Sequence, residues 1–310
     1  MKRVGLLACY LALFLGCATW ANGSELSRFK HLVIFGDSLS DNGNSLSLFD
    51  LPKSPYYDGR WSNGPNWVDY FPSVAHHFST IAPYFPNPKN GTNFAVGGAI
   101  SADLLHSGAN GFPAQIPTYL ASTQRQAFPD DLYVIWTGAN DFAELIRPTD
   151  TAANILQGII CLQKAGARQF VVVSVPDISL TPEVTALGGA VVLAAKEFVF
   201  TVNALLEVEL LSYGWSHGIR IEFVDINPTF TQLVLNPGQY GFTNSAGEAF
   251  NPNLPISATN PVSDPNDYVF WDGFHPTTRV HLIAAQVIYQ AVTKRSLFPE
   301  VVPVPLTRSY

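Results

Sequence analysis

The sequence predicts an α/β protein with a doubly wound, mainly parallel sheet. Short apolar runs that end at turn residues alternate with longer stretches of helical periodicity, which is the order that a parallel sheet requires. The later runs are apolar throughout, as expected for strands that are covered on both faces. The predicted strands are 31–35, 132–136, 169–175 and 220–226, with a weaker one near 92–95, and the predicted helices are 151–165, 189–213 and 277–293.

Composition indicates a globular protein with a large core. Of the 310 residues, 47% are hydrophobic and 13% are charged, which leaves too little charge for a disordered chain. The formal net charge of −7 repels the phosphate backbone of nucleic acids. We therefore expect a folded domain without a nucleic-acid partner.

The N-terminus has the pattern of a secretory signal peptide. Lys2 and Arg3 precede an apolar run over 4–15, and small residues follow. We expect residues 1–23 to be removed on export, which would place the mature protein outside the cell or in the periplasm. The residues before Cys17 also fit, less closely, a lipoprotein cleavage site. No later segment is expected to be long and apolar enough to cross a membrane.

Cysteine usage predicts no internal disulfide. Cys9 and Cys17 lie in the predicted signal peptide, so the mature chain would keep only Cys161. Cys161 falls within the helical pattern of 151–165, where we expect a small core side chain.

Two stretches interrupt the alternation of strands and helices. Residues 49–88 and 236–267 are rich in Pro, Tyr, Trp and Asn, so both are expected to be surface insertions in a single domain over 24–310. Apolar side chains in and near the first insertion either line a groove for an acyl chain or form satellite cores under the loops. These side chains are Phe49, Leu51, Tyr56, Tyr57, Trp61, Phe112, Ile116 and Tyr119.

A serine follows the first predicted strand. The run 31–35 stops at Gly36, Asp37 and Ser38, and open parallel sheets place their ligands at the carboxyl ends of the strands. Ser38 is therefore a candidate nucleophile. Alternatively, Asp37 and Ser38 simply cap the next helix.

Two further segments offer hydrogen-bond donors. The pair Gly97 and Gly98 allows a backbone N–H to face a ligand oxygen, although an ordinary turn is the alternative. Asn140 follows the predicted strand 132–136 and can donate through its amide, or it can cap the following helix.

A turn before the last predicted helix contains Asp272 and His275. Their spacing lets the carboxylate accept a hydrogen bond from one imidazole nitrogen, while the other nitrogen faces outward as a base. Together with Ser38, these residues supply a nucleophile, a base and the carboxylate that orients the base. The backbone N–H groups of Ser38 and Gly98, with the Asn140 amide, supply donors for an oxyanion.

With these residues the chain resembles the GDSL, or SGNH, hydrolase family. Four blocks occur in the family's order and span nearly the whole mature chain: 36–40, 93–99, 138–141 and 272–276. The resemblance implies a single-domain, three-layer α/β/α sandwich with a flavodoxin-like sheet, and a triad of Ser38, Asp272 and His275. It also implies Ser38, Gly98 and Asn140 as oxyanion donors, with Gly98 chosen over Gly97 by the family's spacing.

A second resemblance narrows the branch. Residues 35–44 and 59–68 look like the lipolytic branch, which includes secreted bacterial phospholipases, lysophospholipases and glycerophospholipid–cholesterol acyltransferases, and plant lipases. This implies a serine esterase acting on (lyso)phospholipid esters at a membrane surface, with acyl transfer to an alcohol as a further activity. The alternatives are an esterase for short-chain or carbohydrate acetyl esters, and a secreted binding module without catalysis.

Other motifs are interpreted as structural. Residues 214–218 fit the Gly-x-Ser-x-Gly pattern, but they follow a helical pattern and precede a strand, which is the reverse of the order that exposes a nucleophile. Ser216 is therefore not expected to be catalytic. The spacings at His76 and His77, and at Asp264 and Asp267, do not suit a metal, so we expect no metal or cofactor.

Overall fold

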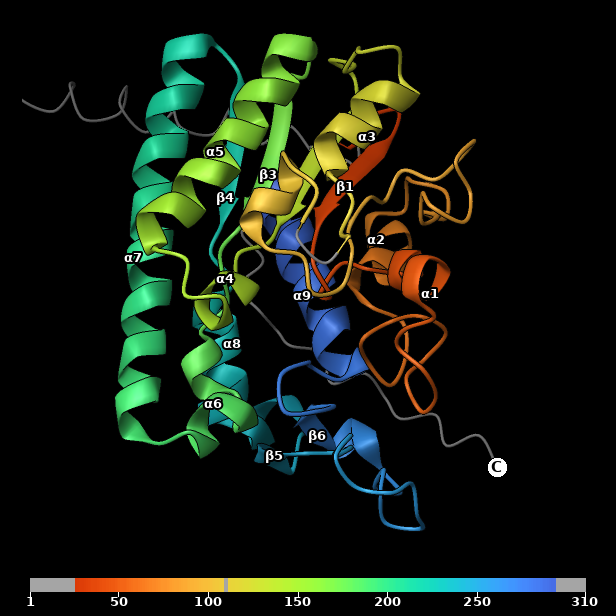
Figure 1. The fold of residues 1–310 in the computed structure, drawn as a ribbon, viewed down its shortest axis with the longest axis vertical. Helices are drawn as coiled ribbons and strands as arrows, with labels where there is room; N and C mark the ends of the chain where they lie inside the picture. The colour runs from red at the N-terminus through yellow and green to blue at the C-terminus, as the bar shows by residue number, and fades with distance from the viewer. Residues whose placement is uncertain (1–25, 109–110, 294–310) are drawn as a thin grey trace, which may run out of the picture.

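The computed structural model describes residues 26–108 and 111–293 (Figure 1). The predicted signal peptide, with Cys9 and Cys17, lies outside the described residues. The central sheet has four parallel strands in the order β1-β2-β3-β4, which confirms the predicted fold class. The strands are β1 (Leu32–Gly36), β2 (Leu132–Trp136), β3 (Gln169–Val173) and β4 (Arg220–Val224).

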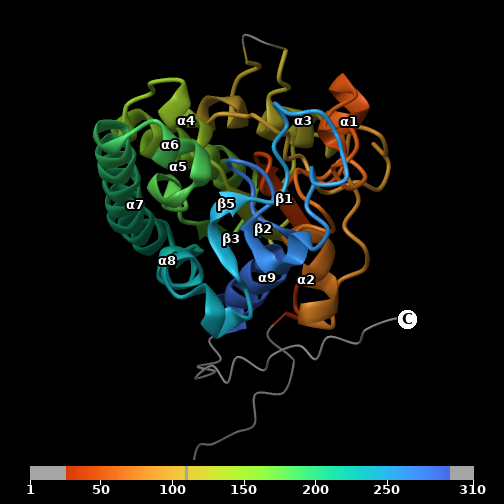
Figure 2. The ribbon, with the colours of Figure 1, turned by 90° about the horizontal axis from the view of Figure 1, so that it is seen from below.

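Helices cover both faces of this sheet and make the molecule a three-layer sandwich. Figure 2 shows α5 and α7 on one side of the strands and α2 and α9 on the other. The α-helices are α1 (Asn44–Phe49), α2 (Trp67–Ala75), α3 (Gln115–Ser122), α4 (Asn140–Ala143), α5 (Pro148–Ala165), α6 (Pro182–Ala186), α7 (Gly189–His217), α8 (Asn227–Leu235) and α9 (Thr278–Thr293). Short 3₁₀ turns cover Ser101–Leu104, Ile178–Leu180, Pro237–Tyr240 and Pro265–Asp267.

Alternate side chains of each strand enter two different cores. Val33 and Phe35 of β1 pack with α3, α5 and α7, whereas Leu32 and Ile34 pack with α2 and α9. Neighbouring side chains of a strand point to opposite faces, so a strand buried on both faces must be apolar at every position. This explains why the predicted strands read as continuous apolar runs.

The weak strand predicted near 92–95 forms a single bridge beside β1. Asn93 pairs in parallel with Ile34, the Phe94 N–H donates to the Ile34 carbonyl at 2.7 Å, and the Val96 N–H donates to the Gly36 carbonyl at 3.1 Å. These bonds place the segment at the free edge of β1. They also bring the glycines at 97 and 98 to the end of that strand.

Both predicted surface insertions contain regular structure. The middle of 49–88 is a buried helix and not a surface loop, which corrects the prediction for that part. That stretch includes α2, whose Trp67, Val68 and Phe71 are buried under the sheet. Asn66 caps the helix and Pro72 lies inside it, and the proline together with the aromatic composition obscured the helical pattern. The stretch 236–267 contains β5 (Asn244–Glu248), which pairs in parallel with β6 (Tyr268–Phe270).

Helix α7 is apolar around most of its circumference. Gly189–His217 is long and apolar enough to cross a membrane, by length and composition alone, which the sequence analysis did not expect. Its inner face packs against the sheet core through residues such as Val202 and Leu206. Only 28% of the apolar window is buried, so α7 is not a fully buried core helix, and one helix of this kind is weak evidence for a membrane span.

Candidate active site

Ser38 lies in a tight turn directly after β1. The Gly36 N–H and C=O are both bonded to the side-chain amide of Gln115, at 2.8 and 2.7 Å, which anchors the end of the strand. The Asp37 carbonyl then accepts from the N–H groups of Ser40 and Asp41, both at 3.0 Å, and this closes the turn. The serine is thereby held at the carboxyl edge of the sheet, as predicted.

The three predicted triad side chains form one chain of hydrogen bonds. The Ser38 Oγ lies 2.9 Å from His275 Nε2, and His275 Nδ1 lies 2.8 Å from Asp272 Oδ2. The other oxygen of Asp272 accepts the backbone N–H groups of Phe274 and His275, at 2.9 and 2.6 Å. Because Oδ2 faces the imidazole, Nδ1 carries the proton and Nε2 is free to accept the serine proton.

Nearby carboxylates set the charge state of the three triad side chains. Burial alone would raise the pKa of Asp272, but the charge of His275 and hydrogen bonds from His275 and Tyr56 lower it to about 2. For His275, burial favours the neutral ring, yet the nearby Asp272, Asp37 and Glu183 raise its pKa above the ordinary value. Asp272 is therefore ionised at neutral pH, and it stabilises an imidazolium when His275 accepts a proton.

The residues of the predicted oxyanion donors line one cavity together with His275. Among the described residues, the backbone N–H groups of Ser38 and Gly98 have no acceptor, whereas the Gly97 N–H is bonded to Asp41 and Ser45, at 2.8 Å each. Gly98 has φ +83°, which a side chain would disfavour. The Asn140 amide donates to the Ala99 carbonyl at 2.9 Å, and its second hydrogen remains for a ligand.

A buried carboxylate holds the oxyanion loop to the nucleophile turn. Asp41 is fully buried and accepts the N–H groups of Gly43 and Asn44 on one oxygen, and those of Ser45 and Gly97 on the other, at 2.8–3.0 Å. The Gly97 bond joins two segments that are far apart in the sequence. Asp41 therefore fixes the position of Gly98 relative to Ser38.

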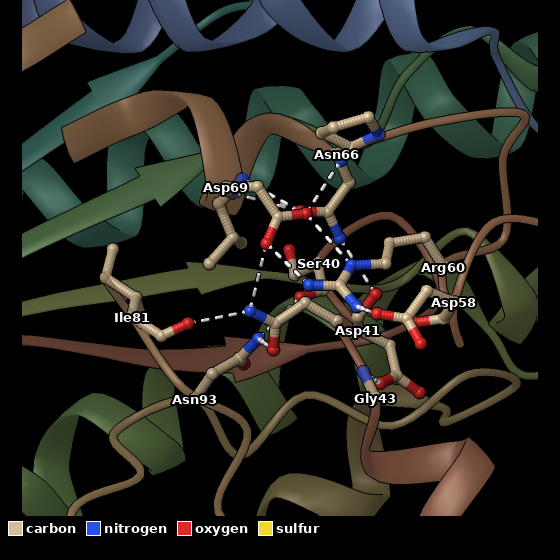
Figure 3. Close-up of polar contacts among 12 residues, drawn as sticks. Ser40, Asp41, Gly43, Asp58, Arg60, Asn66, Asp69, Ile81 and Asn93 are labelled. Atoms are coloured by element: carbon tan, nitrogen blue, oxygen red, sulfur yellow. Dashed lines mark hydrogen bonds and ion pairs between the residues drawn. The ribbon is translucent and has the colours of Figure 1, made fainter. Parts of the chain in front are cut away.

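A second polar cluster supports this turn from outside (Figure 3). Arg60 donates to both oxygens of Asp69, at 3.0 and 2.8 Å, and the same carboxylate accepts the Asn66 N–H at the start of α2. The Asn66 side chain donates to the Asp41 carbonyl, and the Asn93 side chain donates to the Ser40 carbonyl, at 2.8 and 2.7 Å. The polar residues that follow Ser38 thus have a structural explanation.

An apolar cavity of about 420 Å³ opens at the catalytic side chains. Ser38, Gly98, Asn140 and His275 line it together with apolar side chains from the first insertion and the 111–113 region. The apolar lining consists of Phe49, Leu51, Trp61 and Phe112. Of the predicted groove residues these four lie at the cavity, whereas Ile116 and Tyr119 belong to the core, and Tyr57 lies at the surface.

A narrower apolar cavity, of about 60 Å³, reaches Ser38 and His275 from the other side. It is walled by 3₁₀-turn, α8 and α9 side chains such as Ile178, Phe230 and Ile283. Its volume is far below that of a site for a drug-sized ligand, whereas the larger cavity falls within that range. The larger cavity is therefore the better candidate for the substrate site.

Sequence reasoning missed two aromatic residues at the triad. The Tyr56 hydroxyl donates to Asp272 Oδ2 at 2.6 Å, and the Trp61 ring lies against the His275 ring with centroids 5.3 Å apart. Trp61 also leaves no room for a side chain at Gly97. The aromatic composition of 49–88 was the available signal, but it does not say which ring meets which polar group.

The Gly-x-Ser-x-Gly motif at 214–218 and the remaining cysteine lie away from the triad. Ser216 is exposed in the last turn of α7, and Gly218 ends that helix in the left-handed conformation. Cys161 is a free thiol, partly buried against the core. In the part of the chain that the structure describes, no group of three His, Cys, Asp or Glu side chains is arranged to hold a metal ion.

Comparison with known proteins identifies the family of this chain. Residues 32–288 match the model of the GDSL-like Lipase/Acylhydrolase family. The chain is 26% identical to the thermolabile hemolysin of Vibrio parahaemolyticus, over 88% of this chain and 66% of that protein. It is 29% identical to the phosphatidylcholine-sterol acyltransferase of Aeromonas hydrophila, over 82% of this chain and 87% of that protein. A carbohydrate acetylesterase structure from Sinorhizobium meliloti superposes with a TM-score of 0.47 at 13% identity, over 86% of this chain and 99% of that chain. The family model spans most of the described chain, and the protein belongs to the GDSL-like lipase/acylhydrolase family of carboxylic ester hydrolases.

Proposed function

We propose that this protein is an exported serine esterase that hydrolyses acyl esters of phospholipids or lysophospholipids through an acyl-enzyme. The observation that carries the proposal is the continuous Ser38–His275–Asp272 chain at the apolar cavity of about 420 Å³. A serine hydroxyl is a weak nucleophile at neutral pH and requires such a base. The cavity suits an ester whose acyl part is long and apolar.

In the acylation step, Ser38 Oγ attacks the ester carbonyl carbon, and its proton passes to His275 Nε2 across 2.9 Å. Asp272 remains ionised and stabilises the imidazolium. The carbonyl oxygen becomes an oxyanion, which the backbone N–H groups of Ser38 and Gly98 and the Asn140 amide stabilise. His275 then protonates the leaving alcohol, and the acyl group stays on Ser38.

In the second step, His275 takes a proton from the water that attacks the acyl-enzyme, and it returns this proton to Ser38 Oγ as the bond to the acyl group breaks and the fatty acid leaves. An alcohol in place of water would accept the acyl group by the same route. The relative named phosphatidylcholine-sterol acyltransferase supports a phospholipid as the acyl donor, at 29% identity. Lysophospholipase, phospholipase A and acyltransferase activities share the acyl-enzyme and differ in what enters the cavity.

The proposal of export rests on the sequence pattern alone. The basic start, the apolar run over 4–15 and the small residues that follow support a cleaved signal peptide. N-terminal sequencing of the mature protein from the periplasm and the medium tests it, and an uncleaved chain in the cytoplasm would contradict it.

A lipid panel tests the substrate class. Purified protein is incubated with diacyl and lyso phosphatidylcholine, with and without cholesterol, and the products are identified by mass spectrometry. We expect free fatty acid from at least one phospholipid, and none from the Ser38→Ala variant. Turnover of short-chain esters or acetylated sugars with no turnover of either phospholipid would contradict the lipid assignment, and cholesteryl ester would identify acyl transfer.

A further inference from the structure

Tyr56 lies on the side of Asp272 that faces away from the nucleophile. Its hydroxyl donates to Asp272 Oδ2 at 2.6 Å, and the same oxygen faces His275 Nδ1 at 2.8 Å. Two backbone N–H groups occupy the other oxygen. Asp272 is 4% exposed, so water does not replace these donors. Oδ1 also lies 3.0 Å from Nδ1, so the backbone fixes one oxygen and Tyr56 fixes the other, which is the oxygen nearer to the imidazole.

The Tyr56 ring is held by aromatic neighbours from two segments. It makes edge contacts with Trp61, Phe250 and Trp271, with ring centroids 5.8, 5.6 and 6.0 Å apart. Edge-to-face packing of this kind fixes the plane of a ring. The hydroxyl is thus aimed at Asp272 by packing that a phenylalanine would preserve.

The segment that carries Tyr56 also forms part of the substrate cavity. Leu51 and Trp61 line the cavity, and Trp61 lies against the His275 ring. The Tyr57 N–H donates to the Ser62 carbonyl at 2.9 Å, and Arg60 is anchored to Asp69. Leu51 and Trp61 therefore contact the substrate space, and Tyr56 between them contacts the triad carboxylate.

We infer that Tyr56 is a positioning residue of this enzyme, which holds the Asp272 carboxylate for His275 and couples the cavity wall to the triad. The inference rests on the proposed catalytic roles of Ser38, His275 and Asp272. Burial and the neighbouring Asp272 raise the pKa of Tyr56 well above its ordinary value, so the phenol keeps its proton throughout the assay range. The hydroxyl is a donor at every pH at which the enzyme is tested.

Loss of the hydroxyl has two expected effects. Oδ2 loses one of its two partners and can shift, although Oδ1 stays on its two backbone N–H groups, so the productive alignment of Nδ1 is less populated. A carboxylate that has lost a hydrogen bond is also more basic, so it pairs more strongly with imidazolium and raises the pKa of His275 further. Both effects act through Asp272 and disappear when Asp272 no longer carries a charge.

The test compares Tyr56→Phe with Tyr57→Phe in the full chain. Tyr57 is 46% exposed, lies next to Tyr56 and does not line the cavity, so its variant removes a phenol hydroxyl from the same loop. Hydrolysis of a soluble short-chain ester is measured from pH 5 to 9, and the rate of labelling by a fluorophosphonate is measured alongside. We expect Tyr56→Phe to lower kcat about tenfold and to move the acid limb of kcat/KM to higher pH. Tyr57→Phe should change neither quantity.

A double-mutant cycle separates positioning from packing. In an Asp272→Asn background, Tyr56→Phe should change the labelling rate by less than about twofold, because the carboxylate that it holds is gone. An equal loss in both backgrounds, or an acid limb that does not move, would overturn the inference. An equal loss in Tyr57→Phe would do the same. Failure of the proposed function is a separate result, since it appears as activity retained by Ser38→Ala whatever Tyr56 does.

Discussion

His275 stands between carboxylates that all favour its charged form. Its pKa is raised above 6.5, because the charge and hydrogen bond of Asp272, with Asp37 and Glu183, outweigh the burial that favours the neutral ring. A protonated His275 cannot accept the Ser38 proton, so activity is lost as the pH falls through this raised value. We expect kcat/KM for a soluble ester to rise with pH with a midpoint above 6.5, and a midpoint clearly below 6.5 would contradict this electrostatic description.

Asp37 provides a way to move that midpoint. Burial, partly offset by the Leu39 N–H bond and the charge of His275, raises the pKa of Asp37 to about 7. Asp37→Asn keeps the oxygen that accepts from Leu39 and removes the negative charge near His275. The pKa of His275 should fall, and the acid limb should move to lower pH. Asp130→Asn, which removes an exposed carboxylate before β2, is the control and should leave the limb in place.

At the level of single residues, the sequence predicts the side chains that react better than the side chains that position them. Ser38, Asp272 and His275 are recognisable because each lies in a short motif at an element boundary. Tyr56 is not, because its partner Asp272 lies 216 residues away in the chain. Which aromatic ring meets a buried carboxylate depends on tertiary packing, and no local pattern encodes it.

The connection from β1 to α1 is built around one carboxylate. Asp41 accepts four backbone N–H groups, including that of Gly97 beside the oxyanion donor Gly98. In Asp41→Asn one oxygen becomes an NH₂ group that faces N–H donors. We expect the free energy of unfolding to fall by about 2–3 kcal/mol, and kcat to fall at least tenfold because Gly98 moves. Chemical denaturation and ester hydrolysis measure the two effects.

Asp50→Asn is the matched control for Asp41, since Asp50 is an exposed carboxylate at the end of the adjoining helix α1. It should change neither stability nor kcat. A similar loss in both variants would argue against a special role for Asp41.

The Arg60–Asp69 pair joins the loop before α2 to the helix itself. The pair is bidentate and largely buried, with 15% and 17% of the two side chains exposed. Lysine cannot reproduce this fork, so Arg60→Lys should lower the free energy of unfolding by about 1–2 kcal/mol. Arg147 makes the same bidentate contact with Asp150 at an exposed site, and Arg147→Lys should show no measurable change. Equal effects in the two variants would contradict the importance of burial.

Elements with strong periodicity or continuous apolar runs are predictable from this sequence, and elements defined by their neighbours are not. The four strands and the helices α5, α7 and α9 follow the predicted ranges within a few residues. Helix α2 was missed because Pro72 and its aromatic residues resemble loop composition, although Asn66 and Asp69 form a capping box. The strand β5 reads Asn-Ser-Ala-Gly-Glu, which has no strand propensity of its own, and it exists because β6 pairs with it.

At the scale of the whole molecule, the site is assembled by the topology. The turn after β1, the segment beside β1, the end of β2 and the loop before α9 meet at one edge of the parallel sheet. The order of the four motifs in the sequence predicts this meeting, because carboxyl ends of parallel strands share an edge. The wall contributed by residues 49–61 is not predicted by that rule, and it supplies both the cavity lining and the hydrogen bond to Asp272.

The central claim is that Ser38 is the nucleophile, and a covalent label tests it most directly. The protein is treated with a fluorophosphonate, digested, and the modified peptide is identified by mass spectrometry. We expect one adduct, on Ser38, that is lost in Ser38→Ala, greatly slowed in His275→Ala and unchanged in Ser216→Ala. An adduct on Ser216, or labelling and ester hydrolysis that persist in Ser38→Ala, would contradict it.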